Sequence, residues 1–211
     1  MDFKSCIDKE HSILMEGALG ERLKREYHLQ FNDQVAMADL IYDAKGQSAL
    51  ASLWQEYIHI AGCHGLPFLA ATPTRRDTGL PYIISFTIQK DGKLIDGTAI
   101  ADAIAYIDCL VQPKPVCYMT NCVYPGIVYQ ALSQPFNQNA LVHSRFRGIQ
   151  ANTSPLSYAE LDGSLDLKCS DPVPFAEEMM KLRRISSMNI FGGCCGTDGR
   201  HMEQVARRLQ A

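Results

Sequence analysis

The chain has 211 residues, of which 46% are hydrophobic and 20% charged, and its formal net charge is −3. This balance is typical of one soluble globular domain, and the slight negative charge gives no electrostatic reason to expect binding to nucleic acid or to an anionic membrane. No run of about 18 uninterrupted apolar residues is present. The polar N-terminal segment lacks the apolar core of a secretory signal, so we predict a cytoplasmic protein.

Short apolar runs alternate along the chain with longer amphipathic segments. In the first half of the chain we predict a strand at 12–15, helices at 19–27, 33–42 and 47–61, strands at 66–71 and 81–88, and a helix at 97–111. In the second half we predict a strand at 115–120, a helix at 126–132, a strand at 141–144 and a long surface loop at 152–174. A helix at 175–184, a strand at 188–191 and a helix at 198–209 follow the loop. Strands that alternate with helices indicate an α/β protein built on a parallel sheet.

The helix at 47–61 is the most clearly defined of these elements. Apolar residues recur in it at three- and four-residue spacing and form one face, which includes Trp54 and Ile58, and Gly62 follows where a helix stop is expected.

One junction breaks the alternation of strands and helices. Parallel neighbouring strands need a crossover of a dozen or more residues. Between the strand at 66–71 and the strand at 81–88 there is room for a turn but not for a helix. These two strands are therefore antiparallel, or they are not neighbours in the sheet, or a segment is missing between them.

The cysteines, eight in number, would allow four disulfides in a secreted protein. The length of the chain, its ample core and the missing signal favour reduced thiols instead. Cys194 and Cys195 are adjacent, and neighbouring residues rarely meet the geometry of a disulfide. Others, such as Cys63, Cys109 and Cys117, lie in apolar segments, and we expect them to be small core residues.

The segment 191–197, Phe-Gly-Gly-Cys-Cys-Gly-Thr, is the sharpest motif in the sequence. Its glycines allow a tight turn at the end of an apolar strand, and active sites of parallel α/β proteins lie at such strand ends. Cys122 also follows a strand, so three thiols could meet there and leave the fourth position of a tetrahedral zinc ion open. A phosphate-binding turn or simple packing of the two adjacent cysteines would fit the same residues. The nearby His201 is expected to be a solvated residue on the first turn of a helix.

These residues resemble the signature of the homocysteine S-methyltransferase family. The Gly-Gly-Cys-Cys-Gly-Thr run at 192–197, after an apolar strand, agrees with it, and so does the upstream Asn121-Cys122 pair. Three other segments agree in the same order along the chain: 16–23 resembles the opening motif of the family, 84–97 its fifth-strand segment, and 147–152 the segment after its seventh strand.

The resemblance implies a TIM-type (β/α) barrel in which Cys122, Cys194 and Cys195 bind Zn²⁺. The sulfur of homocysteine would be the fourth ligand, and zinc would keep it ionised without a general base. The bound thiolate would then attack the methyl group of a sulfonium donor, either S-methylmethionine or S-adenosylmethionine, and give methionine. Glu16, Gly17 and Asn121 are implied as substrate-binding residues, with Glu16 holding the amino group. No catalytic side chain beyond the metal site is implied.

The chain departs from the family pattern in two places. Glu16 stands where the family usually has Asp, and its extra methylene changes the geometry at the amino group. A TIM barrel takes about 250 residues, and the third and fourth βα units have no counterpart here. We therefore predict that about two βα units are missing between Thr74 and Pro81, and that residues 1–211 form one incomplete homocysteine-binding barrel domain.

The sequence thus predicts a zinc-dependent homocysteine S-methyltransferase of methionine biosynthesis, with small-molecule substrates as its partners. A shortened barrel could also exchange elements between protomers and form a homo-oligomer. A rival hypothesis is a catalytically impaired family member that binds zinc or a ligand. A third is a phosphate-binding barrel protein.

Overall fold

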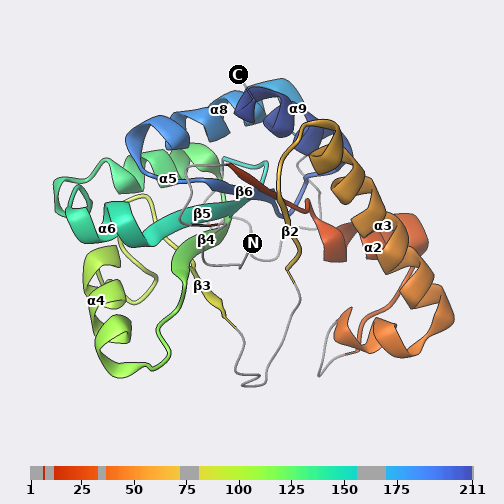
Figure 1. Ribbon diagram of the computed structural model, residues 1–211, viewed down its shortest axis with the longest axis horizontal. Coiled ribbons are helices and arrows are strands. Elements are labelled where there is room, and N and C mark those ends of the chain that lie inside the picture. Colours follow the sequence, from red (N-terminus) through yellow and green to blue (C-terminus); the bar gives the residue numbers. More distant parts are fainter. Residues whose placement is uncertain (1–6, 8–11, 33–36, 72–80, 156–169, 211) are drawn as a thin grey trace.

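The computed structural model describes residues 7, 12–32, 37–71, 81–155 and 170–210, and they form a six-stranded sheet surrounded by helices (Figure 1). The strands are β1 (Ile13–Met15), β2 (Phe68–Leu69), β3 (Ile83–Phe86), β4 (Cys117–Val123), β5 (Phe146–Ala151) and β6 (Ile190–Gly193). The helices are α2 (Leu19–Tyr27), η1 (Met37–Tyr42), α3 (Ala44–Cys63), α4 (Ile100–Leu110), α5 (Pro125–Leu132), η2 (Pro135–Asn137), α6 (Ala140–Arg145), α8 (Pro172–Ile185) and α9 (Gly199–Leu209). The predicted α/β class is confirmed.

The strand order is that of a barrel with one opening. The sheet runs β2-β1-β6-β5-β4-β3, and every pair of neighbours is parallel. The last strand, β6, pairs with the first, β1, as in a closed (β/α) barrel. Among the described strands, β2 and β3 are the two edges and do not pair with each other. They are therefore parallel members of one sheet but not neighbours, and the antiparallel alternative is wrong.

The opening lies at the junction where the sequence predicts missing βα units, between Thr74 and Pro81. Figure 1 shows the helices following the outside of the sheet in an arc, from α4 at one end, over α8 and α9, to α2 and α3 at the other. No described helix covers the side between α4 and α3. The predicted incomplete barrel is confirmed.

The core has an inner and an outer layer, because side chains of a strand alternate between the two faces of a sheet. Along β1, Ile13 and Met15 pack in the inner layer with residues of β4 and β6, whereas Leu14 packs in the outer layer against the helices. Buried Ile7 joins the inner layer. Its carbonyl accepts hydrogen bonds from Asn189 at 3.0 Å and Arg147 at 3.2 Å, which closes the end of the barrel where the strands begin.

Side-chain caps fix the beginnings of several helices. Asp43 accepts a hydrogen bond from the backbone N–H of Gly46 at the start of α3, and Asp171 accepts one from Val173 at the start of α8. None of the helices in the described ranges is long and apolar enough to cross a membrane.

Some local predictions are wrong. The segment predicted as a strand at 141–144 lies in α6, because the side chain of Asn139 accepts a hydrogen bond from the N–H of Val142 and caps a helix there. The predicted surface loop at 152–174 begins with buried residues, Asn152 to Ser154, and ends inside α8. Its middle part, 156–169, lies outside the described residues, as does 33–36 of the predicted helix at 33–42.

The exposure of three apolar side chains also differs from the prediction. Ile58 of α3 is 51% exposed, although its spacing places it near the apolar face of that helix. Three cysteines were expected in the core. Cys63 and Cys109 are exposed instead, whereas Cys117 is buried as expected. Both exposed cysteines lie toward the ends of outer helices, where apolar composition alone does not indicate which side faces the sheet.

Candidate metal centre

Three cysteine sulfurs meet at the carboxyl end of the sheet. The Sγ atoms of Cys122, Cys194 and Cys195 all lie within 4.8 Å of one another. Cys122 and Cys194 are 2.7 Å apart, and Cys194 and Cys195 are 3.8 Å apart. In the described part of the chain this is the one group of three or more potential ligands close enough to share a metal ion. The structure therefore brings together the three residues expected to be metal ligands.

The backbone turns sharply at both places that supply sulfur. Cys122 lies in β4 with a φ of 56°, a left-handed conformation that is sparsely populated by residues other than glycine. The other two sulfurs follow Gly193, the last residue of β6. A Cβ atom on Gly193 would come within 2.2 Å of the Thr197 Oγ1 atom. Glycine is therefore required for the chain to approach the turn that carries both cysteines.

A hydrogen-bond network holds the 194–197 turn in place. The N–H of Cys194 donates to the carbonyl of Ala151 at 2.6 Å. The hydroxyl of Thr197 donates to the carbonyl of Cys194 at 2.6 Å and accepts from the N–H of Ala18 at 2.9 Å. The N–H of Gly196 donates to the carboxylate of Glu21 at 2.8 Å. Because these amides already have protein acceptors, one of them an anion, the turn does not have the character of a phosphate-binding loop.

The three thiols share their ionisation. Hydrogen bonds from Cys194 and Cys195 lower the pKa of Cys122 to about 3. The same contact with Cys122 raises the pKa of Cys194, and contact with Cys122 also raises that of Cys195. The side-chain amide of Asn121 donates a further hydrogen bond to the Cys122 sulfur at 3.3 Å. The cluster thus stabilises one thiolate even before a cation is considered.

The donor set fits a thiophilic metal ion such as zinc. Thiolates are preferred ligands of zinc, and a tetrahedral site with Zn–S distances of about 2.3 Å places neighbouring sulfurs about 3.8 Å apart. The Cys194–Cys195 distance is 3.8 Å, whereas Cys122 and Cys194, at 2.7 Å, would have to separate by about 1 Å. Three protein ligands leave one coordination position for a substrate atom.

A cavity of about 370 Å³ opens beside the sulfur cluster. Its walls come from the turn between β1 and α2, from the strand ends of β4, β5 and β6, and from Met37 and Ala71. The lining residues are Glu16, Gly17, Ala18, Leu19, Gly20, Glu21, Met37, Ala71, Asn121, Gln150, Gly193, Cys194 and Cys195. The described lining residues include two carboxylates and no lysine or arginine, so this part of the cavity wall is suited to a positively charged ligand group.

Glu16 is a buried carboxylic acid on the wall of this cavity. Both of its oxygens accept from the N–H of Ala71 at 3.1 Å, and Oε1 also accepts from the Gln150 amide at 3.1 Å. Burial raises the pKa of Glu16 to about 7, although the hydrogen bonds lower it. A cation placed next to this group would favour its ionised form.

The other two predicted substrate-binding residues also line the cavity. A Cβ atom on Gly17 would come within 2.7 Å of the Tyr57 hydroxyl, so glycine lets the backbone lie close to α3 here. Asn121 accepts a hydrogen bond from Ser85 at 2.6 Å and donates to Cys122, which orients its side chain toward the sulfur cluster. The structure thus brings Glu16, Gly17 and Asn121 to one site with the cysteines.

Sequence reasoning missed Gln150, Glu21 and Thr197 as parts of this site. Each of the three lies in a segment that resembles the family, at 192–197, 16–23 or 147–152, but no role at the site was predicted for any of them. His201 is fully buried, contrary to the expectation of a solvated residue. It forms a capping box with Asp198 and packs edge-on against Phe175. Its pattern, Asp-x-x-His at a helix start, could have indicated this.

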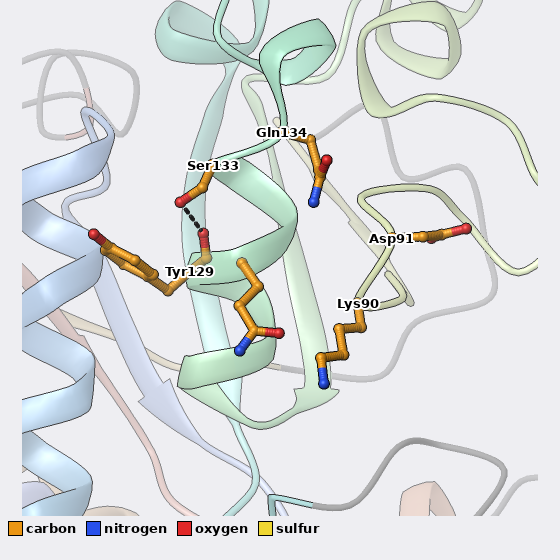
Figure 2. Close-up of a pocket in the computed structure, with 6 residues that line it drawn as sticks. Lys90, Asp91, Tyr129, Ser133 and Gln134 are labelled. Atoms are coloured by element: carbon orange, nitrogen blue, oxygen red, sulfur yellow. Dashed lines mark hydrogen bonds between the residues drawn. The ribbon is translucent and has the colours of Figure 1, made fainter.

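A second hollow, of about 640 Å³, lies between the turn after β3 and the end of α5. Lys90, Asp91, Tyr129, Gln130, Ser133 and Gln134 line it (Figure 2). Figure 2 shows Lys90 and Asp91 pointing in different directions, and the Ser133 hydroxyl already donates to the carbonyl of Tyr129 at 2.7 Å. Its polar groups do not converge, in contrast to those beside the cysteines.

Comparison with models of known protein families identifies the family of the chain. A model of the homocysteine S-methyltransferase family matches residues 66–209, which include all three clustered cysteines. The chain therefore belongs to the homocysteine S-methyltransferase family. Glu16 and Gly17 lie outside the matched range.

Among solved structures, the homocysteine methyltransferase MmuM from Escherichia coli, in its metallated form, is similar to the chain at 15% sequence identity and a TM-score of 0.41. The match covers 92% of this chain and 59% of that enzyme, so the chain spans less than two thirds of its length. None of the curated proteins compared gives a match.

Proposed function

We propose that this chain is a homocysteine S-methyltransferase that transfers a methyl group from a sulfonium donor to the sulfur of homocysteine, giving methionine. The observation that carries the proposal is the convergence of Cys122, Cys194 and Cys195 beside a cavity, in a chain of this family. We propose that these three residues hold Zn²⁺. When bound, zinc would lower the pKa of the substrate thiol and thereby supply the thiolate nucleophile at neutral pH.

The transfer balances without a general acid. The thiol of homocysteine releases its proton to solvent, and the sulfur electron pair forms a new S–CH₃ bond. The S–CH₃ bond of the donor breaks, and its electron pair stays on the donor sulfur, which leaves as a neutral thioether. S-methylmethionine and S-adenosylmethionine are the donors we favour, because a cavity lined by two carboxylates suits cationic substrates.

The protein side chains would position the thiol substrate. The Glu16 carboxylate, held by Ala71 and Gln150, would bind the amino group of homocysteine. The backbone at Gly17 gives the substrate room, and Asn121 would orient both Cys122 and the substrate through its amide. Positioning of this kind can supply several kcal/mol of a reaction barrier.

A second candidate function rests on the opening of the barrel. β2 and β3 are unpaired edges among the described strands, and the chain spans 59% of the length of the similar methyltransferase. A family member of this form could keep the metal and bind a thiol ligand without transferring a methyl group. The two functions share the metal centre and differ in turnover.

The test measures zinc per chain and methionine formation from homocysteine with each sulfonium donor. The purified chain should contain about one zinc per molecule, and Cys195→Ser should lose both the zinc and the activity. Cys109→Ser is the matched control, because Cys109 is an exposed cysteine on α4 and should change neither quantity.

Undiminished methionine formation by metal-depleted protein would contradict the role of zinc. Zinc and homocysteine binding without methionine formation would identify the second candidate function. A well-folded chain that binds no zinc would rule out both.

A further inference from the structure

Glu21 is a second carboxylate that faces the cavity beside the cysteines. It lies in the first turn of α2 and lines the same cavity as Glu16, which comes from the end of β1. Its Oε2 atom accepts the N–H of Gly196, the residue after Cys195, at 2.8 Å. The carboxylate is thereby fixed next to the turn that carries two of the three sulfurs.

The charge of Glu21 is only weakly compensated by the protein. Among the described residues, Glu21 forms an ion pair with Arg25, whose Nη1 atom lies 3.4 Å from Glu21 Oε1. The side chain of Arg25 is 48% exposed. The buried guanidinium of the same helix, Arg22, is paired instead with Glu26 and Glu56. An exposed pair such as Glu21–Arg25 contributes little, so Glu21 can accept a ligand cation.

The chemistry of an ammonium group requires more than one acceptor. An ammonium has three N–H donors, and a buried donor without a partner is destabilising. The oxygens of Glu16 already accept from Ala71 and Gln150, which leaves Glu16 fewer acceptor positions for a ligand. A second carboxylate on the same cavity would supply the missing acceptor.

We propose that Glu21 binds the ammonium group of the thiol substrate together with Glu16, and so selects an amino-acid thiol over a thiol without an amino group. The proposal rests on the proposed function, because it assumes that the thiol of an amino acid binds at the cysteine cluster. The thiol and ammonium groups of such a substrate are only a few bonds apart. A substrate whose thiol binds at the cysteine cluster therefore has its ammonium group close to the Glu21 carboxylate, which is hydrogen-bonded to the residue after Cys195.

The experiment compares the binding of two ligands by isothermal titration calorimetry to the zinc-loaded protein. Homocysteine carries the ammonium, and 4-mercaptobutanoate is the same molecule without it. In Glu21→Gln the amide oxygen can still accept from Gly196, but the charge is removed. The preference for homocysteine over 4-mercaptobutanoate should fall about ten-fold in this variant, because a hydrogen bond to a charged group is lost.

Glu26→Gln is the matched control. It removes one negative charge from the same helix, and Glu26 also contacts Arg25, at 3.3 Å, but it does not line the cavity. Its preference for homocysteine should equal that of the unchanged protein. Glu21→Asp keeps the charge and should retain most of the preference, and it serves as the second variant if Glu21→Gln binds zinc poorly.

Each outcome separates a ligand-binding role from a structural one. Equal weakening of both thiols in Glu21→Gln, or loss of zinc in both Glu21 variants, would mean that Glu21 only supports the turn, and the proposal would be wrong. An unchanged preference would also overturn it, while the proposed function stands. If the unchanged protein binds zinc but neither thiol, the proposed function fails first and the role of Glu21 fails with it.

Discussion

The sulfur atoms of Cys122 and Cys194 lie 2.7 Å apart, although 72 positions separate the two residues in the chain. One belongs to β4 and the other follows β6, and β5 lies between these strands in the sheet. The short distance between the two sulfurs therefore depends on the register of the β4–β5 pair and of the β5–β6 pair. A shift of one residue in either pair would turn a side chain to the opposite face of the sheet and separate the donors.

Removal of the Cys122 thiol should abolish tight metal binding. Cys122→Ser leaves two of the three sulfurs and should lower the affinity for Zn²⁺ by roughly 100-fold or more, since even changes outside the ligand set typically lower it 10–100-fold. Competition with a chromophoric chelator measures this affinity. Cys63→Ser, at an exposed position of α3, should leave it unchanged. Equal affinities in the two variants would contradict the assignment of Cys122 as a ligand.

Neutralisation of Glu16 should stabilise the protein at alkaline pH. The pKa of Glu16 is raised from 4.5 to about 7 by burial, so between these pH values the folded protein retains a proton that the unfolded chain has released. The free energy of unfolding therefore falls as the pH rises through this range, and the loss is complete above pH 7. Glu16→Gln should match the unchanged protein near pH 4 and exceed it by roughly 3 kcal/mol near pH 8.

Urea unfolding of both proteins at the two pH values measures this difference. A stability difference that does not change with pH would show that Glu16 does not titrate in the folded protein. At the same time Glu16→Gln should weaken homocysteine binding at pH 8, because the carboxylate that we propose for the amino group is gone.

Loss of the Thr197 hydroxyl should loosen the turn that carries two of the cysteines. Thr197→Val keeps the shape of the side chain but leaves the buried N–H of Ala18 without its acceptor and removes a donor to the Cys194 carbonyl. We expect a loss of about 2 kcal/mol in the free energy of unfolding and weaker zinc binding. Ser133→Ala removes an exposed hydroxyl at the end of α5 and is the control. Similar effects of the two substitutions would contradict the role of Thr197.

Two glycine substitutions should have opposite effects. Gly193→Ala places a Cβ atom 2.2 Å from the Thr197 hydroxyl oxygen and should destabilise the fold by about 3 kcal/mol. Gly62→Ala, near the end of α3, meets no atom within 4 Å and should stabilise the helix by up to about 1 kcal/mol. Thermal melts of both variants test the pair, and a tolerated Gly193→Ala with full zinc content would show that the turn can move aside.

Some local elements are predicted from the sequence with accurate bounds. The predicted helix at 19–27 has the bounds of α2, and the predicted strand at 12–15 contains β1. The sequence also locates the sulfur cluster, because three thiols that follow parallel strands must meet at one edge of the sheet. The opening between β2 and β3 follows from a junction too short for a crossover.

What the sequence does not give is the side of an element that faces its neighbours. Cys109 and Ile58 are apolar residues on outer helices, and their exposure depends on the rotation of the whole helix against the sheet. The burial of His201 depends on its capping contact with Asp198 and on the packing of α8 against α9. The closeness of Glu21 to Gly196 likewise joins residues at opposite ends of the chain, and no local pattern records such a contact.

The position of the barrel opening has a consequence for how such a chain could arise. In a ring of βα units each strand pairs only with its two neighbours, so two adjacent units can be lost while the remaining strands keep their pairing. Cys122 lies in β4, the other two sulfur donors directly follow β6, and Glu16 directly follows β1; none of these is an edge strand. A single excision in the gene, between the codons for β2 and β3, would therefore shorten the protein by a quarter of its ring and leave its three-cysteine centre assembled.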